Sequence, residues 1–185
     1  KPQSIEDLIA GISLYRPGPM DFIPQYIKGK NNPEDITYDC PMLEPILKPT
    51  YGCIVYQEQV MQIVRDLAGY SLGRSDRRAM SKKKTSVMEK ERQNFIYGNP
   101  EENVPGCISN GIDEKTANKI YDDMIDFAKY AFNKSHAACY AVVAYQTAYL
   151  KTYYPVEFMA ALMTSVVDNT DKVAGYIYAC RQMNI

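Results

Sequence analysis

The sequence is 185 residues long, with 46% hydrophobic residues and a formal net charge of −1 at pH 7. This length and composition predict one globular domain or two small ones, and the charge excludes a uniformly basic nucleic-acid binder. The five cysteines are widely spaced and form no zinc-binding pattern, so we expect free thiols in a reducing cytoplasm. Without an apolar leader or a long uncharged stretch, the chain is expected to be cytoplasmic, with no membrane partner.

Hydrophobic periodicity predicts a mainly helical chain, with no alternating pattern of the kind that marks strands. The first helix begins after a cap at Ser4 and ends near Tyr15, since Pro17 and Pro19 cannot continue it. Seven prolines punctuate residues 16–51. We expect short turns and extended loop there, held over a core by apolar side chains.

A clear amphipathic helix follows Gly52. Gly69 is expected to end it in the left-handed conformation. Periodicity does not decide whether residues 53–56 begin this helix or form an extended lead into it.

The second half of the chain is predicted to hold five further helices around a loop at residues 99–111. They are a helix from Thr85 or Ser86 to Tyr97, one after Asp113, one from Ser135 to Tyr153, one from Pro155, and one capped by Asn169 or Thr170. The helix from Ser135 to Tyr153 is apolar on most faces, so we expect it at the centre of the core. The predicted fold class is all-α: an irregular multi-helix domain with proline-rich loops and little or no sheet.

Arg16 is the first candidate functional residue. It lies in the motif Tyr-Arg-Pro-Gly-Pro, directly after the first helix. Two prolines around a glycine restrict the backbone and so fix the direction of the guanidinium. A preoriented guanidinium suits bidentate binding of phosphate, whereas the alternative is a surface arginine beside a turn that ends a helix.

A second candidate is the stretch Val-Tyr-Gln-Glu-Gln-Val at residues 55–60. Tyr56 could stack on a base or a sugar, while Gln57, Gln59 and the carboxylate of Glu58 offer hydrogen-bond donors and acceptors. The alternative is a polar first turn of a helix with a half-buried tyrosine.

Positive charge is concentrated between residues 74 and 92, where eight basic residues accompany three acidic ones. The densest part comprises Arg77, Arg78, Lys82, Lys83 and Lys84. If this stretch is helical, Arg78 and Lys82 share one face. Such cations can track a phosphate backbone or clamp a triphosphate, and the alternative is a solvated charged face.

The sequence Asn133-Lys134-Ser135-His136 opens the long apolar helix. Amides at a helix N-terminus beside Lys134 and His136 would form an anion site. Alternatively, Asn133 and Ser135 only cap the helix and His136 packs internally. Known phosphate-loop, nucleophile-elbow and zinc-protease motifs do not occur, and no metal site is expected within the chain.

Together these motifs resemble the C-family of bacterial replicative polymerases, the DNA polymerase III alpha subunits. The resemblance covers essentially the whole chain. It rests on LYRPGPM (14–20), PTYGCIVYQEQVMQI (49–63), LAGYSLG (67–73), RRAMSKKK (77–84), FNKSHAACYAVVAYQTAYLK (132–151) and YPVEFMAALMTS (154–165).

The resemblance implies that residues 1–185 are part of a fingers domain, the helical element that closes over the incoming deoxynucleoside triphosphate. It implies that Arg16 contacts the triphosphate and that Tyr56 lies beside the nucleotide. Further positive charge toward the triphosphate or the template would come from Arg77, Arg78, Lys82, Lys83 and Lys84. Additional candidate contacts to nucleotide or DNA are Gln57, Gln59, Asn133, Lys134, Ser135 and His136.

The catalytic aspartates of this family belong to a palm domain outside this chain, and the thumb, phosphatase-like and clamp-binding regions are also absent. The resemblance therefore implies that the parent enzyme binds Mg²⁺ through its palm and that this chain alone is inactive. The implied partners are a deoxynucleoside triphosphate, primer-template DNA, the remaining polymerase domains and, through the parent, the sliding clamp and other replisome subunits. The alternative is a non-catalytic helical module that binds DNA or a protein.

Overall fold

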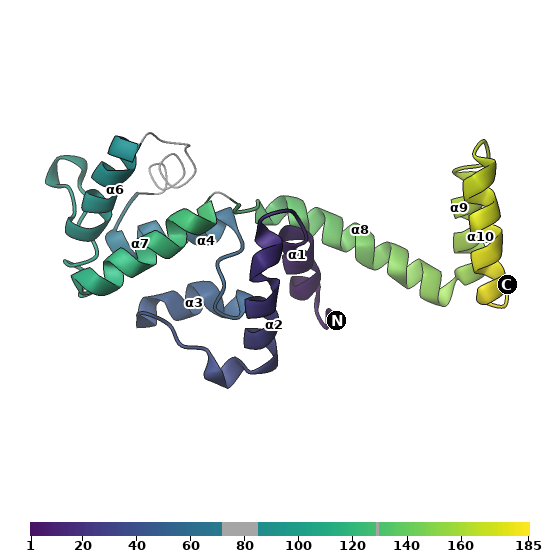
Figure 1. The fold of residues 1–185 in the computed structure, drawn as a ribbon, viewed down its shortest axis with the longest axis horizontal. Coiled ribbons are helices and arrows are strands. Elements are labelled where there is room, and N and C mark those ends of the chain that lie inside the picture. Colours follow the sequence, from purple (N-terminus) through teal and green to yellow (C-terminus); the bar gives the residue numbers. More distant parts are fainter. Residues whose placement is uncertain (72–84, 129) are drawn as a thin grey trace. The chain divides into compact units, whose positions relative to one another are not determined.

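The computed structural model of the chain describes residues 1–71, 85–128 and 130–185. Within these ranges the chain forms α-helices, short 3-10 turns and loops without any β-strand, which confirms the all-α prediction (Figure 1). It divides into two compact units, residues 1–138 and residues 139–185. None of the helices in the described ranges is long and apolar enough to cross a membrane.

The first unit contains most of the helices. They are α1 (Ile5–Leu14), α2 (Ile23–Asn31), α3 (Glu44–Leu47), α4 (Gln57–Ala68), α6 (Thr85–Tyr97), α7 (Glu114–Ala128) and the first residues of α8 (Lys134–Tyr153). Short 3-10 turns connect them at Pro19–Phe22, Pro33–Asp35, Pro41–Leu43, Lys48–Thr50 and Pro100–Glu102. Each turn has a proline in its first two positions, where the fixed φ of proline suits the start of a helical turn. The short turns predicted for residues 16–51 are therefore confirmed, but the nine-residue helix α2 in the same segment was not predicted.

The ends of the early helices follow the predicted caps. The Ser4 side chain accepts a hydrogen bond from Asp7 N (3.2 Å) at the start of α1. Gly69 ends α4 in the left-handed conformation, with φ of 78°. Tyr56 has extended backbone angles, so residues 53–56 lead into α4 and do not form its first turn. The structure thereby decides the question that periodicity left open.

The core of the first unit forms where α4, α6 and α7 pack together (Figure 1). The apolar stripe of α4 faces inward, with Ile63 and Leu67 both 0% exposed. Helix α6 contributes Phe95, and α7 contributes Ala117 and Ile120. Burial of such side chains is the main force that stabilises a domain of this size.

The second unit contains the rest of α8, α9 (Pro155–Thr164) and α10 (Thr170–Gln182), with α9 packed against α10. Pro155 starts α9 and Asn169 caps α10 by accepting from Lys172 N (3.0 Å), as predicted. All five cysteines of the chain are free thiols.

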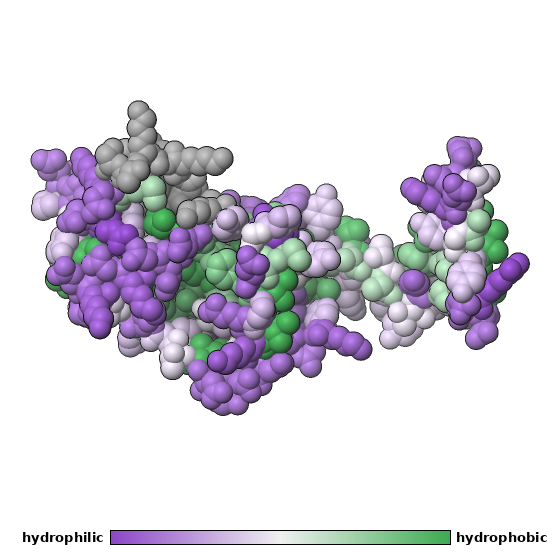
Figure 2. Space-filling view, viewed as in Figure 1, coloured by the Kyte–Doolittle hydropathy of each residue, from purple (hydrophilic) through white to green (hydrophobic). Residues whose placement is uncertain are grey.

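The prediction that α8 lies at the centre of the core is wrong. Ala137 and Ala141 are buried, but large apolar side chains along the helix are exposed. These are Tyr140, Val142, Val143, Tyr145, Tyr149, Leu150 and Tyr153. The hydrophobicity of a helix determines the free energy that its burial would release. It does not determine whether a neighbouring surface is available to bury the helix. Figure 2 shows apolar side chains, in green, at the surface of the second unit.

Candidate functional site

Three segments of the first unit meet at one place. They are the proline turn (residues 15–19) after α1, the start of α4, and residues 130–136 at the start of α8. A parallel bridge joins Tyr56 to Phe132, in which Gln57 N donates to Phe132 O (3.0 Å) and Phe132 N donates to Val55 O (3.3 Å). Because Arg16 contacts the same short segment, sequence motifs that are far apart in the chain form one site.

The Arg16 side chain is held by two backbone carbonyls and an aromatic ring. Its Nε donates to Ser13 O (2.9 Å) and its Nη2 donates to Tyr130 O (2.6 Å). Its Cζ lies 4.4 Å from the centroid of the Phe132 ring, a cation–π contact. Burial lowers the pKa of the guanidinium, which nevertheless stays charged because arginine keeps its proton in proteins.

Among the described residues, no carboxylate forms an ion pair with Arg16, so its positive charge is not neutralised there. Both of its hydrogen-bond acceptors are neutral carbonyls. A fixed, uncompensated guanidinium is the feature expected of an anion contact.

Gly18 allows the proline turn to approach residues 130–136. Its φ of 97° lies in the region that favours glycine. A Cβ at this position would lie 2.6 Å from Cε1 of the Tyr130 ring. Tyr130 also provides the carbonyl that accepts a hydrogen bond from Arg16. The proline turn therefore packs directly against the residue that orients the guanidinium.

Tyr56 lies inside this site and not at its surface. The residue is 2% exposed, and its hydroxyl has no hydrogen-bond partner among the described residues. Lys134 Nζ lies 5.3 Å from the ring centroid and 3.1 Å from Glu6 Oε2. Burial raises the pKa of Tyr56, and the nearby carboxylates of Glu6, Glu58 and Asp7 raise it further. The phenol is therefore neutral and supports the site from within, and its contact with a nucleotide stays a prediction.

Gln59 uses its whole side-chain amide inside the first unit. Its Oε1 accepts from Val55 N (2.8 Å) and Tyr56 N (3.0 Å). Its Nε2 donates to Ile46 O (3.0 Å) and Thr50 Oγ1 (2.7 Å). These bonds tie the extended lead to α3 and α4, so Gln59 holds the backbone of Tyr56 in place in this structure.

Gln57 is also used within the site, although it is less buried than Gln59. Its Nε2 donates to Ala131 O (3.2 Å), next to the bridge between Tyr56 and Phe132. The side chain therefore fastens the start of α4 to residues 130–136.

Glu58 fixes the start of α8, a role that sequence analysis did not predict. Its Oε1 and Oε2 each accept from Lys134 N (3.1 Å), and Oε1 also accepts from Asn133 Nδ2 (3.2 Å). Asn133 Oδ1 accepts from His136 N (2.9 Å). A carboxylate is stabilised at a helix N-terminus, but nothing in the sequence shows which helix Glu58 faces. The predicted anion site at the N-terminus of α8 is occupied here by this carboxylate.

Of the two caps that the sequence offered for α8, Asn133 and Ser135, the structure uses Asn133. Helix α8 begins at Lys134, and Asn133 is the residue whose side chain caps it. Asparagine and serine are both good caps, so local propensity cannot choose between them. Ser135 is exposed, and so is His136, whose ring packs edge-on against Phe132 with the centroids 5.4 Å apart. His136 therefore lies at the surface beside the ring that also contacts Arg16.

The structure does not place the predicted basic cluster. Arg77, Arg78, Lys82, Lys83 and Lys84 all lie outside the described residues. Across the residues that are described, no group of three or more His, Cys, Asp or Glu side chains could hold a metal ion.

Comparison with known proteins identifies relatives of the whole chain. A family model described as the bacterial DNA polymerase III alpha subunit finger domain matches residues 1–103. The chain is 50% identical over 187 aligned positions to a DNA polymerase III subunit alpha from Xylella fastidiosa, and 50% identical over 192 positions to one from Thermus aquaticus. It is 48% identical over 194 positions to one from Pseudomonas aeruginosa. Each alignment covers 100% of this chain but only 15% or 16% of these relatives.

Proposed function

The chain belongs to the family of bacterial DNA polymerase III alpha subunit finger domains, and from this premise we propose that it binds the incoming deoxynucleoside triphosphate during DNA replication. The observation that carries the proposal is the fixed and uncompensated guanidinium of Arg16. The chain spans about a seventh of the length of the relatives it matches, so template-directed DNA synthesis is proposed for the longer protein and not for this piece.

Arg16 supports this proposal because its orientation is set before any ligand arrives. The contacts to Ser13 O, Tyr130 O and the Phe132 ring restrict the side chain. Binding of an anion there costs less side-chain entropy than binding to a free surface arginine, because the Arg16 side chain is already restricted. The guanidinium would balance the charge of the triphosphate as the nucleotide is positioned for reaction.

The other candidate residues surround this contact. We propose that His136 and Ser135, both exposed, line the edge of the nucleotide or DNA path. Gln57, Gln59, Asn133 and Lys134 would act by holding the three segments together, and Tyr56 would form the inner wall beside the nucleotide. Arg77, Arg78, Lys82, Lys83 and Lys84 would add positive charge toward the triphosphate or the template. Such contacts make affinity sensitive to salt.

Catalysis in the longer protein would need groups that this chain does not provide. Magnesium ions would supply charge stabilisation to phosphoryl transfer, and we place their ligands in a palm domain outside this chain. Primer-template DNA, the other polymerase domains, the sliding clamp and further replisome subunits are the proposed partners.

Replacement of Arg16 by alanine in an alpha subunit that carries this chain tests the proposal. Loss of a charge-assisted contact costs about 1.5–3 kcal/mol, so the apparent dissociation constant for nucleotide in single-turnover incorporation should rise about 10- to 100-fold. Arg16→Lys keeps the charge but loses the planar fork, and an intermediate effect is expected.

Arg65→Ala is the matched control, because Arg65 is paired with its neighbour Asp66 (2.6 Å). Nucleotide affinity should not change in this variant. Unchanged single-turnover incorporation by Arg16→Ala, with primer-template binding intact, would count against the proposed role. In that case a helical module that binds only DNA or protein becomes the better description.

The 185-residue chain alone should show no primer extension with magnesium. The expected measurement is an absence of product above background at enzyme concentrations where the longer subunit extends every primer. Robust extension by the chain alone would mean that the catalytic carboxylates lie within it.

A further inference from the structure

Glu58 is a carboxylate in the candidate site to which the proposed nucleotide function gives no role. It belongs to the first turn of α4 and is partly buried. A carboxylate repels a triphosphate, so charge balance with the ligand does not explain its presence there. Its hydrogen bonds indicate a different role.

The Glu58 carboxylate bonds to the two residues that follow Phe132. Lys134 N lies 3.1 Å from both Oε1 and Oε2, and Asn133 Nδ2 donates to Oε1 (3.2 Å). Because Asn133 Oδ1 accepts from His136 N, Glu58 also orients the side chain that caps α8. Hydrogen bonds to an ionised acceptor are stronger than those between neutral groups. Glu58 therefore fixes the place where α8 begins relative to α4.

Phe132 connects these bonds to Arg16. The Arg16 Cζ lies 4.4 Å from the centroid of the Phe132 ring, and Arg16 Nη2 donates to Tyr130 O, two residues earlier in the same segment. The backbone bridge to Tyr56 holds Phe132 itself, and Glu58 holds the two residues after it. A displacement of residues 130–134 would therefore move both the ring and a carbonyl that orient the guanidinium.

We propose that Glu58 is a positioning residue for Arg16, whose carboxylate holds the start of α8 so that Phe132 and Tyr130 O aim the guanidinium at the triphosphate. This role depends on the proposed nucleotide function and adds to it an acidic residue that strengthens the binding of an anion. Repulsion of the triphosphate and orientation of Arg16 have opposite signs when the charge of Glu58 is removed. The proposed role requires that the effect on orientation is the larger of the two.

Glu58→Gln in an alpha subunit that carries the chain separates these two effects. The amide keeps the size of the side chain but replaces one acceptor oxygen by a donor, which cannot bond to Lys134 N or Asn133 Nδ2. The probe is deoxyadenosine triphosphate opposite template thymine, and single-turnover rates at a series of concentrations give its dissociation constant. This constant should rise about two- to thirtyfold, as for other residues that act on a site through a network of contacts. An unchanged or lower dissociation constant would overturn the proposal.

A double-mutant cycle with Arg16→Ala tests whether Glu58 acts through Arg16. If it does, Glu58→Gln should have no further effect once residue 16 is alanine. Additive weakening would overturn the role of Glu58 alone, whereas unchanged affinity in Arg16→Ala would overturn the proposed nucleotide function and the role of Glu58 with it. A merely structural role would lower the amplitude of incorporation and leave the dissociation constant unchanged, which also contradicts a positioning residue.

Asn133→Ser is a milder variant, since it removes one of the three bonds to Glu58 and leaves a residue that can cap α8. It should weaken nucleotide binding less than Glu58→Gln, and only where Arg16 is present. It also provides the test if Glu58→Gln does not fold. Equal loss of affinity with and without Arg16 would overturn the proposal.

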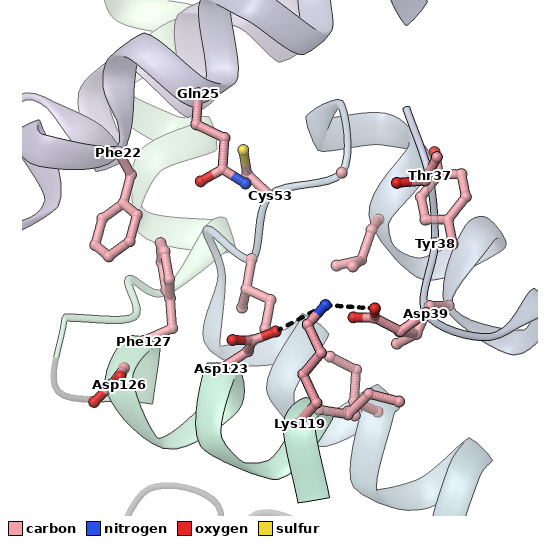
Figure 3. A pocket seen from close by; sticks show the side chains of 16 residues that line it. Phe22, Gln25, Thr37, Tyr38, Asp39, Cys53, Lys119, Asp123, Asp126 and Phe127 are labelled. Carbon is pink, nitrogen blue, oxygen red and sulfur yellow. Dashed lines mark hydrogen bonds and ion pairs between the residues drawn. The ribbon is translucent and has the colours of Figure 1, made fainter. Parts of the chain in front are cut away.

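Asp39→Asn is the matched control, because Asp39 also joins two segments of the first unit through its ion pair with Lys119 of α7 (Figure 3). The pair lies in a cavity of about 430 Å³, and the described residues that line this cavity include none from 15–19, 56–60 or 130–136. Asp39→Asn should leave the dissociation constant unchanged, although it alters the net charge as Glu58→Gln does. Equal effects of the two variants would show that only net charge matters and would overturn the proposal.

Discussion

The two units of the chain use apolar side chains in opposite ways. In the first unit, the helices cover one another, and Ile63 and Leu67 are fully buried. In the second unit, Val143 on α8 is 54% exposed and Leu150 is 45% exposed. The large apolar side chains along most of α8 are exposed, and the helix is stabilised by its own backbone hydrogen bonds and by stacked tyrosines such as Tyr149 and Tyr153 (centroids 4.6 Å apart). Helix formation and burial are therefore separate properties of a sequence, and hydrophobicity alone does not establish the second.

The largest expected difference between the two units appears when one leucine is truncated in each. Leu67→Ala, at a site that is 0% exposed, should lower the free energy of unfolding by about 2–5 kcal/mol, because a cavity is left in the core. Leu150→Ala, at a site that is 45% exposed, should change it by no more than about 0.5 kcal/mol. Urea denaturation followed by far-UV circular dichroism measures both. Similar losses for the two variants would show that Leu150 is packed as Leu67 is.

The stability of the two units should also differ in its dependence on pH, because the first unit buries the carboxylate of Asp7. Burial by itself would raise the pKa of Asp7, but hydrogen bonds from Lys30 Nζ (2.6 Å), Gln3 N (2.8 Å) and Tyr26 OH (3.1 Å) outweigh it and lower this pKa to about 2. A carboxyl group with a depressed folded-state pKa contributes stability above its unfolded pKa. That contribution is lost as the pH falls from about 4 through about 2.

The expected loss from Asp7 in this acid range is up to about 2 kcal/mol of unfolding free energy. Asp7→Asn should abolish this part of the pH dependence, as measured by urea midpoints at a series of pH values. Asp168→Asn is the control in the second unit, where Asp168 is exposed, and its pH profile should match that of the unmodified chain. An unchanged profile in Asp7→Asn would mean that the Asp7 hydrogen bonds do not stabilise the first unit.

The smallest expected effect concerns the helix caps, which should not distinguish the units. Asn133 caps α8 through His136 N (2.9 Å), and Asn169 caps α10 through Lys172 N (3.0 Å). Replacement of either asparagine by alanine should cost about 1 kcal/mol, because a cap acts on the amides of its own helix. Amide hydrogen exchange in the first turn of each helix measures this cost. A much larger loss at Asn133 would indicate that its bond to Glu58 dominates over the cap.

Much of the fold could be predicted because its causes are local. Proline positions explain the short turns, and Ser4, Gly69 and Asn169 end or begin helices as their preferences require. The position of α8 could not be predicted, since burial depends on what lies next to a helix in space. The start of α8 stayed open between two good capping residues, Asn133 and Ser135, and the structure shows that Asn133 caps it.

The site could be predicted only as a set of separate motifs. Sequence analysis identified Arg16, Tyr56 and the residues from Asn133 to His136, and the structure brings these segments together. It could not show that Tyr56 is buried or that the Gln59 side chain hydrogen-bonds to backbone groups. The burial and the hydrogen bonds both depend on contacts with α3 and the lead into α4. The role of Glu58 was missed for the same reason, since its partner amide belongs to a helix far along the chain.

Because Gly18 is closely packed, a substitution at this uncharged residue can affect the orientation of Arg16. Any larger amino acid there must displace the Tyr130 ring and adopt a backbone angle that favours glycine, so we expect the turn that carries Arg16 to shift. Mutations at residue 18 would then disturb the orientation of Arg16 while leaving the isoelectric point and the hydropathy profile almost unchanged. Surveys of polymerase variants that track only basic residues would overlook them.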